Sequence, residues 1–81
     1  MKCKEPGCNG EINENITVHL RVGCSVTAVQ PAHPCSLCGR LYWDDGSLVY
    51  NRPGYRVFLE GSHIIHRDDD NQLVACDFSK V

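Results

Sequence analysis

The chain has 81 residues, a formal net charge of −2 at pH 7 and 42% hydrophobic residues, six cysteines among them. This length allows one domain, and the apolar content argues against intrinsic disorder. The content is nevertheless low for a self-sufficient core, so we expect disulfides or a metal ion to stabilise the fold. The charge lacks the strongly basic character that is typical of a free-standing nucleic-acid-binding domain.

Nothing in the sequence indicates export or insertion into a membrane. Residues 1–6 contain no apolar segment of the kind that a secretory signal needs. The longest uncharged segment, residues 22–39, contains Pro31 and Pro34 among other interruptions, so it cannot span a bilayer. We therefore expect a cytoplasmic protein without a membrane partner. In that compartment, closely spaced cysteines bind metals rather than form disulfides.

Alternation of apolar and polar residues predicts β-strands in the first half of the chain. The clearest strand is residues 15–22, in which the even-numbered residues are apolar and share one face. A second, weaker strand is expected at residues 24–30. Pro31 and Pro34 are expected to end it, because proline lacks the N–H group that a strand ladder uses.

The second half of the chain predicts a meander of short antiparallel strands separated by turn-forming residues. The expected strands are residues 41–43, 48–50, 55–59, 63–66 and 73–78. The expected turns are residues 44–47, 51–54, 60–62 and 68–72. Together these patterns predict an all-β fold, with a short helix at the C-terminus as the alternative there.

Four of the six cysteines form two close pairs, Cys3 with Cys8 and Cys35 with Cys38. Zinc prefers four tetrahedral ligands, and thiolates suit it. Each close pair allows a tight turn to direct two sulfur atoms at one ion, and a β-hairpin between the pairs would bring them together. The sequence therefore predicts one structural Zn²⁺ bound by all four cysteines.

The segments CKEPGCNG (residues 3–10) and PCSLCGRLYW (residues 34–43) together resemble a zinc ribbon, the rubredoxin-like four-cysteine family. The second segment matches the family's Cys-x-x-Cys-Gly pattern, whereas the first has four residues between its cysteines instead of two. The resemblance implies two knuckles, each at the turn of a β-hairpin, that hold one zinc ion between them. We assign residues 1–50 to this ribbon. Residues 51–81 are expected to form a β-meander packed on it within a single domain.

Other uses of the cysteines stay open at this stage. Six cysteines could form three disulfides, in any of 15 pairings, if the protein were exported. A rubredoxin-like site could also hold iron. Cys24 and Cys76 fall in expected strands as small apolar side chains, and a second zinc site with His63 and His66 is the alternative. Because residues three apart on a strand point to opposite faces, these two histidines would need a bulge to converge.

The remaining two histidines are expected to be in contact with solvent. His33 lies in the segment before Cys35, where a solvated loop histidine is the simplest interpretation, and donation to a sulfur atom is the alternative. His19 falls on the polar face of its strand.

We do not expect an enzyme. Four thiolates around zinc leave no position for water or substrate, so such a site is structural. The chain also lacks a glycine-rich phosphate loop and a nucleophile elbow. We expect instead an adaptor module that binds another protein, for example through an unpaired strand edge.

A zinc ribbon that binds nucleic acid, associated with transcription or translation, is the alternative function. It would use cations close to rings that can stack on bases. The candidates are Arg40, Tyr42, Trp43, Arg52, Tyr55 and Arg56. Trp43 and the tyrosines would otherwise complete a small core beside the zinc.

Overall fold

The computed structural model of the chain describes residues 1–22, 29–49, 54–75 and 78–80. In this part of the chain all regular secondary structure is β, which confirms the all-β prediction. No helix long and apolar enough to cross a membrane occurs among these residues. The strands are β1 (Val18–Val22), β2 (Val29–Pro34), β3 (Leu41–Trp43), β4 (Arg56–Glu60), β5 (His63–Arg67), β6 (Leu73–Val74) and β7 (Phe78–Lys80).

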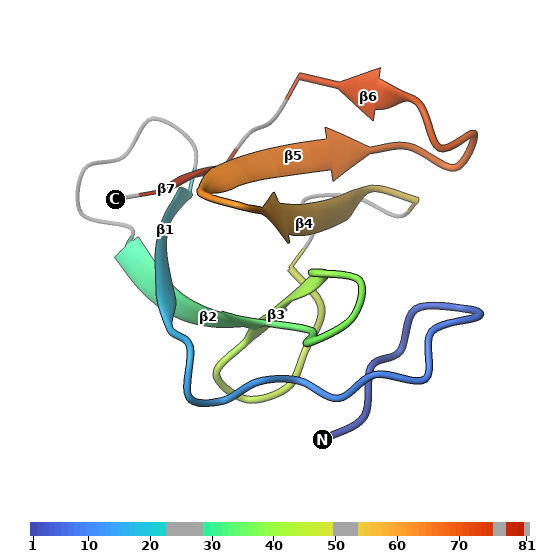
Figure 1. The fold of residues 1–81 in the computed structure, drawn as a ribbon. Coiled ribbons are helices and arrows are strands. Elements are labelled where there is room, and N and C mark those ends of the chain that lie inside the picture. Colours follow the sequence, from blue (N-terminus) through green and yellow to red (C-terminus); the bar gives the residue numbers. More distant parts are fainter. Residues whose placement is uncertain (23–28, 50–53, 76–77, 81) are drawn as a thin grey trace.

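The described strands form two antiparallel sheets (Figure 1). The first sheet has the order β3-β2-β1-β7, and the second has the order β4-β5-β6. Although β7 follows the second sheet in the chain, it pairs with β1, so that Leu20 lies opposite Lys80 and Val22 lies opposite Phe78. β5 also contacts β7, and β3 contacts β4. The two sheets therefore share one core.

The alternation in residues 15–22 does direct apolar side chains inward. Val18 and Leu20 are buried, and His19 is exposed as predicted. Ile16 precedes the strand and is exposed instead of buried. The main core joins apolar residues of both sheets: Val18, Leu20, Ala32, Leu41, Val49, Val57 and Phe78. Trp43 packs against this core with its ring edge-on to Phe78, at a centroid distance of 6.1 Å.

The expectation that the second strand ends at Pro31 is wrong, because Pro31 lies within β2 opposite His19. Pro34 is the last residue of β2, where it pairs with Leu41. A proline lacks the N–H donor but keeps its carbonyl acceptor. Pro34 uses this acceptor, which receives a hydrogen bond of 2.8 Å from the N–H of Asn13. The predicted strand also included residues 24–28, which lie outside the described residues.

The turn at residues 44–47 forms as predicted directly after β3. The N–H of Trp43 donates to the carbonyl of Ser47 at 2.7 Å, which closes the turn. Only a single bridge, between Tyr42 and Leu48, represents the strand expected at residues 48–50. Tyr50 and residues 51–53 of the next expected turn lie outside the described residues.

The predicted strand at residues 73–78 is two strands, β6 and β7, that belong to different sheets. The mostly apolar residues 73–78 predict an extended chain, but they do not show that the chain passes from one sheet to the other. Residues 76–77 between these strands lie outside the described residues. β7 is a strand where a short C-terminal helix was the alternative.

The second cysteine pair lies against the second sheet through a backbone contact at Gly39. The N–H of Leu59 in β4 donates to the carbonyl of Gly39 at 2.7 Å, and Arg40 forms a bridge with Phe58. Gly39 has a φ of +80°, and a Cβ built at this position would lie 2.4 Å from the carbonyl oxygen of Leu59. A glycine is required here both for the backbone conformation and for the close approach of β4.

We predict that Gly39→Ala destabilises the fold more than Gly61→Ala does. Gly61 also has a positive φ, of +62°, but a Cβ there would meet nothing within 4 Å. The control should therefore cost about 1–2 kcal/mol for the left-handed conformation alone. Gly39→Ala must also displace β4 and should cost about 1–3 kcal/mol more. Chemical denaturation of both variants at a fixed Zn²⁺ concentration measures the difference, and equal costs would contradict the close approach.

Candidate metal centre

The first cysteine pair lies in a turn that is closed by backbone hydrogen bonds. Lys2 and Glu11 form an antiparallel bridge, and inside it the N–H of Cys3 donates to the carbonyl of Gly10 at 3.0 Å. The N–H of Cys8 donates to the carbonyl of Glu5 at 3.0 Å. This segment is therefore a hairpin that holds both cysteines near its tip, and we call residues 3–10 the first knuckle.

The second cysteine pair lies in the turn between β2 and β3, residues 35–40, which we call the second knuckle. The N–H of Cys35 donates to the carbonyl of Arg40 at 2.8 Å, and the N–H of Gly39 donates to the carbonyl of Cys35 at 3.1 Å. Ile12 forms a bridge with Cys35, and the N–H of Ser36 donates to the carbonyl of Glu11 at 2.9 Å. These bonds hold the two knuckles side by side.

The four cysteines converge on one point between the knuckles. Their Sγ atoms all lie within 4.8 Å of one another. The Sγ atoms of Cys3 and Cys38 are 3.6 Å apart, and the Sγ atoms of Cys8 and Cys35 are also 3.6 Å apart. Four thiolates at the usual zinc–sulfur distance of about 2.3 Å in a tetrahedron are about 3.8 Å apart, whereas a disulfide needs about 2.05 Å. The four cysteines are therefore free thiols that are positioned to bind a metal ion.

Backbone N–H groups point at three of the sulfur atoms in the same way. The N–H of Glu5 lies 3.5 Å from the Sγ of Cys3, and that of Gly10 lies 3.4 Å from the Sγ of Cys8. The N–H of Leu37 is likewise 3.4 Å from the Sγ of Cys35. Each donor comes two residues after its cysteine. The partial positive charge of its N–H hydrogen stabilises a thiolate.

The environment of Cys35 favours its thiolate. Burial by itself would raise the pKa of Cys35, but the backbone N–H groups of Cys38 and Leu37 outweigh it and lower the pKa to about 7. Burial raises the pKa of Cys38 instead.

Tyr42 in β3 supplies a side-chain hydrogen bond to the centre. Its hydroxyl lies 3.0 Å from the Sγ of Cys3 and accepts a hydrogen bond of 2.7 Å from the N–H of Lys4. Burial, together with the contact to Cys3, raises the pKa of Tyr42 above its usual range, so the phenol keeps its proton. The hydroxyl therefore donates to a thiolate at Cys3. Tyr42 is fully buried beside the centre, and no pattern in the sequence predicted its hydrogen bond to Cys3.

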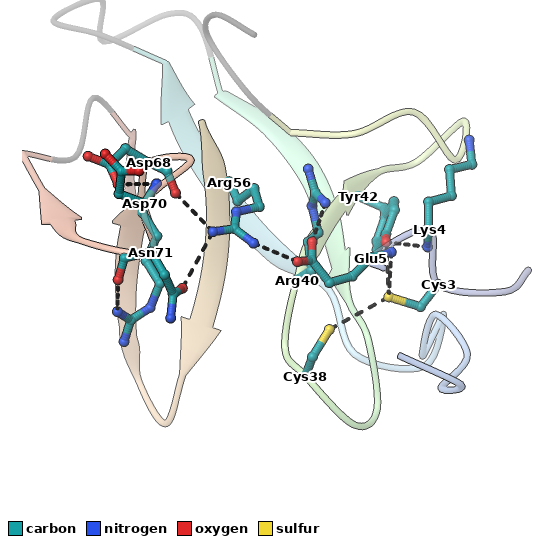
Figure 2. Close-up of polar contacts among 11 residues, drawn as sticks. Cys3, Lys4, Glu5, Cys38, Arg40, Tyr42, Arg56, Asp68, Asp70 and Asn71 are labelled. Atoms are coloured by element: carbon teal, nitrogen blue, oxygen red, sulfur yellow. Dashed lines mark hydrogen bonds and ion pairs between the residues drawn. The ribbon is translucent and has the colours of Figure 1, made fainter. Parts of the chain in front are cut away.

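A network of charged side chains connects the first knuckle to the second sheet (Figure 2). The carboxylate of Glu5 forms ion pairs with Arg40 and with Arg56, the latter at 2.7 Å. Arg56 also donates to the carbonyl of Asp68 at 2.8 Å and to the side chain of Asn71 at 3.4 Å. Arg56 thus lies between the metal centre and the turn after β5, as Figure 2 shows.

The expectation that His33 is a solvated loop histidine is wrong. His33 is buried in β2, and its two ring nitrogens contact the carbonyl of Ile16 and the carboxylate of Asp44, each at 2.9 Å. The hydrogen bond to Asp44, followed by that to Ile16, raises the pKa of His33. His33 therefore links the turn after β3 to the segment before β1, and it is not within the group of metal ligands.

The second site considered for zinc is not formed by the residues that the structure describes. His63 is exposed and His66 is buried in β5, so the two point to opposite faces, as expected for residues three apart. The ring of His66 lies edge-on to that of Tyr55 at a centroid distance of 4.5 Å. Cys24 and Cys76 lie outside the described residues.

Comparison of the chain with protein-family models, with curated proteins and with solved structures finds no match. The interpretation of the metal centre therefore depends on its own geometry. Two hairpins, four convergent sulfur atoms and the hydrogen bonds donated to them define a class of site, a four-cysteine metal centre, independently of any relative.

We predict that Tyr42→Phe weakens metal binding by about tenfold to a hundredfold, as loss of a hydrogen bond to a ligand commonly does. The substitution removes only the hydroxyl, so the Cys3 thiolate loses a donor and the N–H of Lys4 loses an acceptor. Competition for Zn²⁺ against a chromophoric chelator measures the affinity. Tyr55→Phe is the matched control and should bind as the unchanged protein does. Unchanged affinity in Tyr42→Phe would rule out the role of the hydroxyl.

A second prediction concerns the pH dependence of stability at His33. Because its pKa is raised on folding, protonated His33 stabilises the fold below its ordinary pKa of about 6.5, and this contribution is lost as the pH rises through the raised value. Asp44→Asn should lower the pKa of His33 in an NMR titration of the metal-loaded protein. Its destabilising effect should be larger at about pH 6 than at about pH 8.5.

The neighbouring substitution Asp45→Asn is the control for this titration. The carboxylate of Asp45 accepts hydrogen bonds from Ser47 rather than from His33. Proton release from the cysteines affects all three proteins alike, so it cancels in the comparison. A His33 titration that responds equally to both substitutions would contradict the specific contact with Asp44.

Proposed function

We propose that the protein is a zinc ribbon in which Cys3, Cys8, Cys35 and Cys38 bind one structural Zn²⁺, and that it serves as a non-catalytic module for binding another protein. The observation that carries the proposal is the convergence of four sulfur atoms within 4.8 Å from two hairpin turns. The resemblance of both cysteine segments to the zinc ribbon family supports the same interpretation. The first knuckle has four residues between its cysteines instead of two, and it nevertheless closes as a hairpin, which also supports a zinc ribbon.

Zinc is the proposed ion because the donor set consists of thiolates alone. Zinc and iron both accept four cysteines, but closed four-thiolate sites with a structural role are typical of zinc. The metal would supply part of the folding free energy, because the described apolar core is small and a second cluster surrounds the cysteines themselves.

The proposed ligand set of four thiolates excludes catalysis at the metal. Four thiolates complete a tetrahedral zinc site, so no position remains for an activated water or a substrate. Asp44 and Asp45 do not form an acid pair toward the centre, since Asp44 contacts His33 and Asp45 accepts from Ser47.

The ion pairs and burial of the candidate base-binding residues favour a protein partner over nucleic acid. Arg40 and Arg56 are paired with Glu5, so neither guanidinium is available to a phosphate without breaking that network. Tyr42 is fully buried and Trp43 packs on the core. Arg52 lies outside the described residues. Zinc and four thiolates together carry −2, which would give the loaded chain a charge of about −4 and repel a polyanion.

We predict one Zn²⁺ per chain in native mass spectrometry and elemental analysis of protein purified without added metal. Single substitutions of serine for Cys3, Cys8, Cys35 or Cys38 should lose the metal and the cooperative thermal transition, because a structural zinc site provides folding free energy. Cys24→Ser and Cys76→Ser are the controls. Each should keep one zinc and, at most, lose a few kcal/mol of stability.

Three outcomes would contradict the proposal. Loss of metal in all six variants would exclude a site of four specific cysteines. A mass lower by six hydrogens, without metal, would indicate three disulfides and an exported protein. Retention of RNA or DNA by the loaded protein at physiological salt would favour the nucleic-acid function instead.

A further inference from the structure

A groove of about 420 Å³ lies beside the second knuckle. Three parts of the chain form its walls: the segment before β1, the second knuckle, and the end of β4 with the turn that follows it. Its volume lies within the range of about 300–1,000 Å³ that is usual for ligand-binding pockets. The groove is open to solvent.

Two of the groove's side chains are apolar and unusually exposed. Leu37, at the tip of the second knuckle, is 72% exposed, and Ile16, before β1, is 45% exposed. The described residues include only three other large apolar side chains in that condition: Met1, Val29 and Leu73. Ile16 and Leu37 are far apart in sequence and nevertheless line one groove with the half-buried Leu59. Exposed apolar side chains that gather in this way mark a surface for binding.

One charged side chain is among the described residues that line the groove, and it is negative. Glu60 lies at the rim, is exposed and forms no ion pair with any other described residue. Cys35 and Cys38 also line the groove, so the negative charge of the loaded metal centre lies directly beneath it. The nearby cations Arg40 and Arg56 are already paired with Glu5. A positively charged ligand is therefore the complement of this surface.

We propose that this groove binds a segment of a partner protein in which a large apolar side chain is flanked by lysine or arginine. The apolar side chain packs between Ile16 and Leu37, and the flanking cation pairs with Glu60. This inference rests on the proposed protein-binding function and specifies the partner's chemistry. The metal centre would then also position the groove, because the second knuckle holds the metal and presents Leu37 at the surface.

Selection of random peptides displayed on phage against the immobilised zinc-loaded protein tests the groove. We expect enriched peptides to contain Leu, Ile, Met or Phe next to Lys or Arg. Their affinity should fall by about tenfold or more in Leu37→Ser, as loss of a central apolar contact does. The affinity of the same peptides should also fall in Glu60→Lys, because this substitution places a positive charge beside their lysine or arginine. Leu73→Ser, which removes an exposed leucine on β6 away from the groove, should bind them unchanged.

Because Leu37 and Glu60 are exposed, their substitutions should keep one bound zinc, which native mass spectrometry of each variant checks. Enriched peptides that bind Leu37→Ser equally well would overturn the groove while leaving the protein-binding function in place. Enrichment of acidic peptides would overturn the charge assignment. No enriched peptide at all, or competition by an RNA oligonucleotide for the same site, would overturn both the groove and the proposed function.

Discussion

The convergence of four sulfur atoms is the constraint on which the arrangement of the described chain depends. Cys8 and Cys35 are 27 positions apart, and their sulfurs lie 3.6 Å from each other. Four thiolates at this spacing repel one another unless a cation lies between them, and burial further disfavours their charge. A bound cation converts that repulsion into attraction. The hairpins before β1 and between β2 and β3 then have to lie side by side, and the first sheet continues from their bases.

The pairing of Glu5 with Arg40 and Arg56 extends this constraint into the second sheet. Glu5 and Arg40 are almost buried, with side-chain exposures of 12% and 9%. Two guanidinium groups against one carboxylate leave a surplus positive charge, which would be costly without a further anion nearby. Arg56 reduces this cost because it also donates to the carbonyl of Asp68 and to the side chain of Asn71. The ion pair of Glu5 with Arg56 therefore links the first knuckle to β4.

The sequence was sufficient to predict the four-cysteine cluster and the strand-rich fold, because cysteine spacing and apolar alternation are local signals. It predicted β3 and its turn for the same reason. It was insufficient for His33, Arg40 and Arg56, whose side-chain partners come from turns and segments distant in sequence and are known only once the topology is known. The prolines of β2 were misleading because a missing donor matters only where the ladder needs one. The apparent strand at residues 73–78 concealed a passage between two sheets.

The place of β7 in the first sheet has a consequence for the order in which the protein is made. The four cysteines of the two knuckles all precede residue 39, so both knuckles leave the ribosome before β7 does. The outer edge of β1 gains its partner only when residues 78–80 have also left the ribosome. Until then β1 carries a row of unpaired N–H and C=O groups, the state in which strand edges associate with other chains. Pairing with β7 ends that exposure, so residues 78–80 protect this edge as well as bring Phe78 into the core.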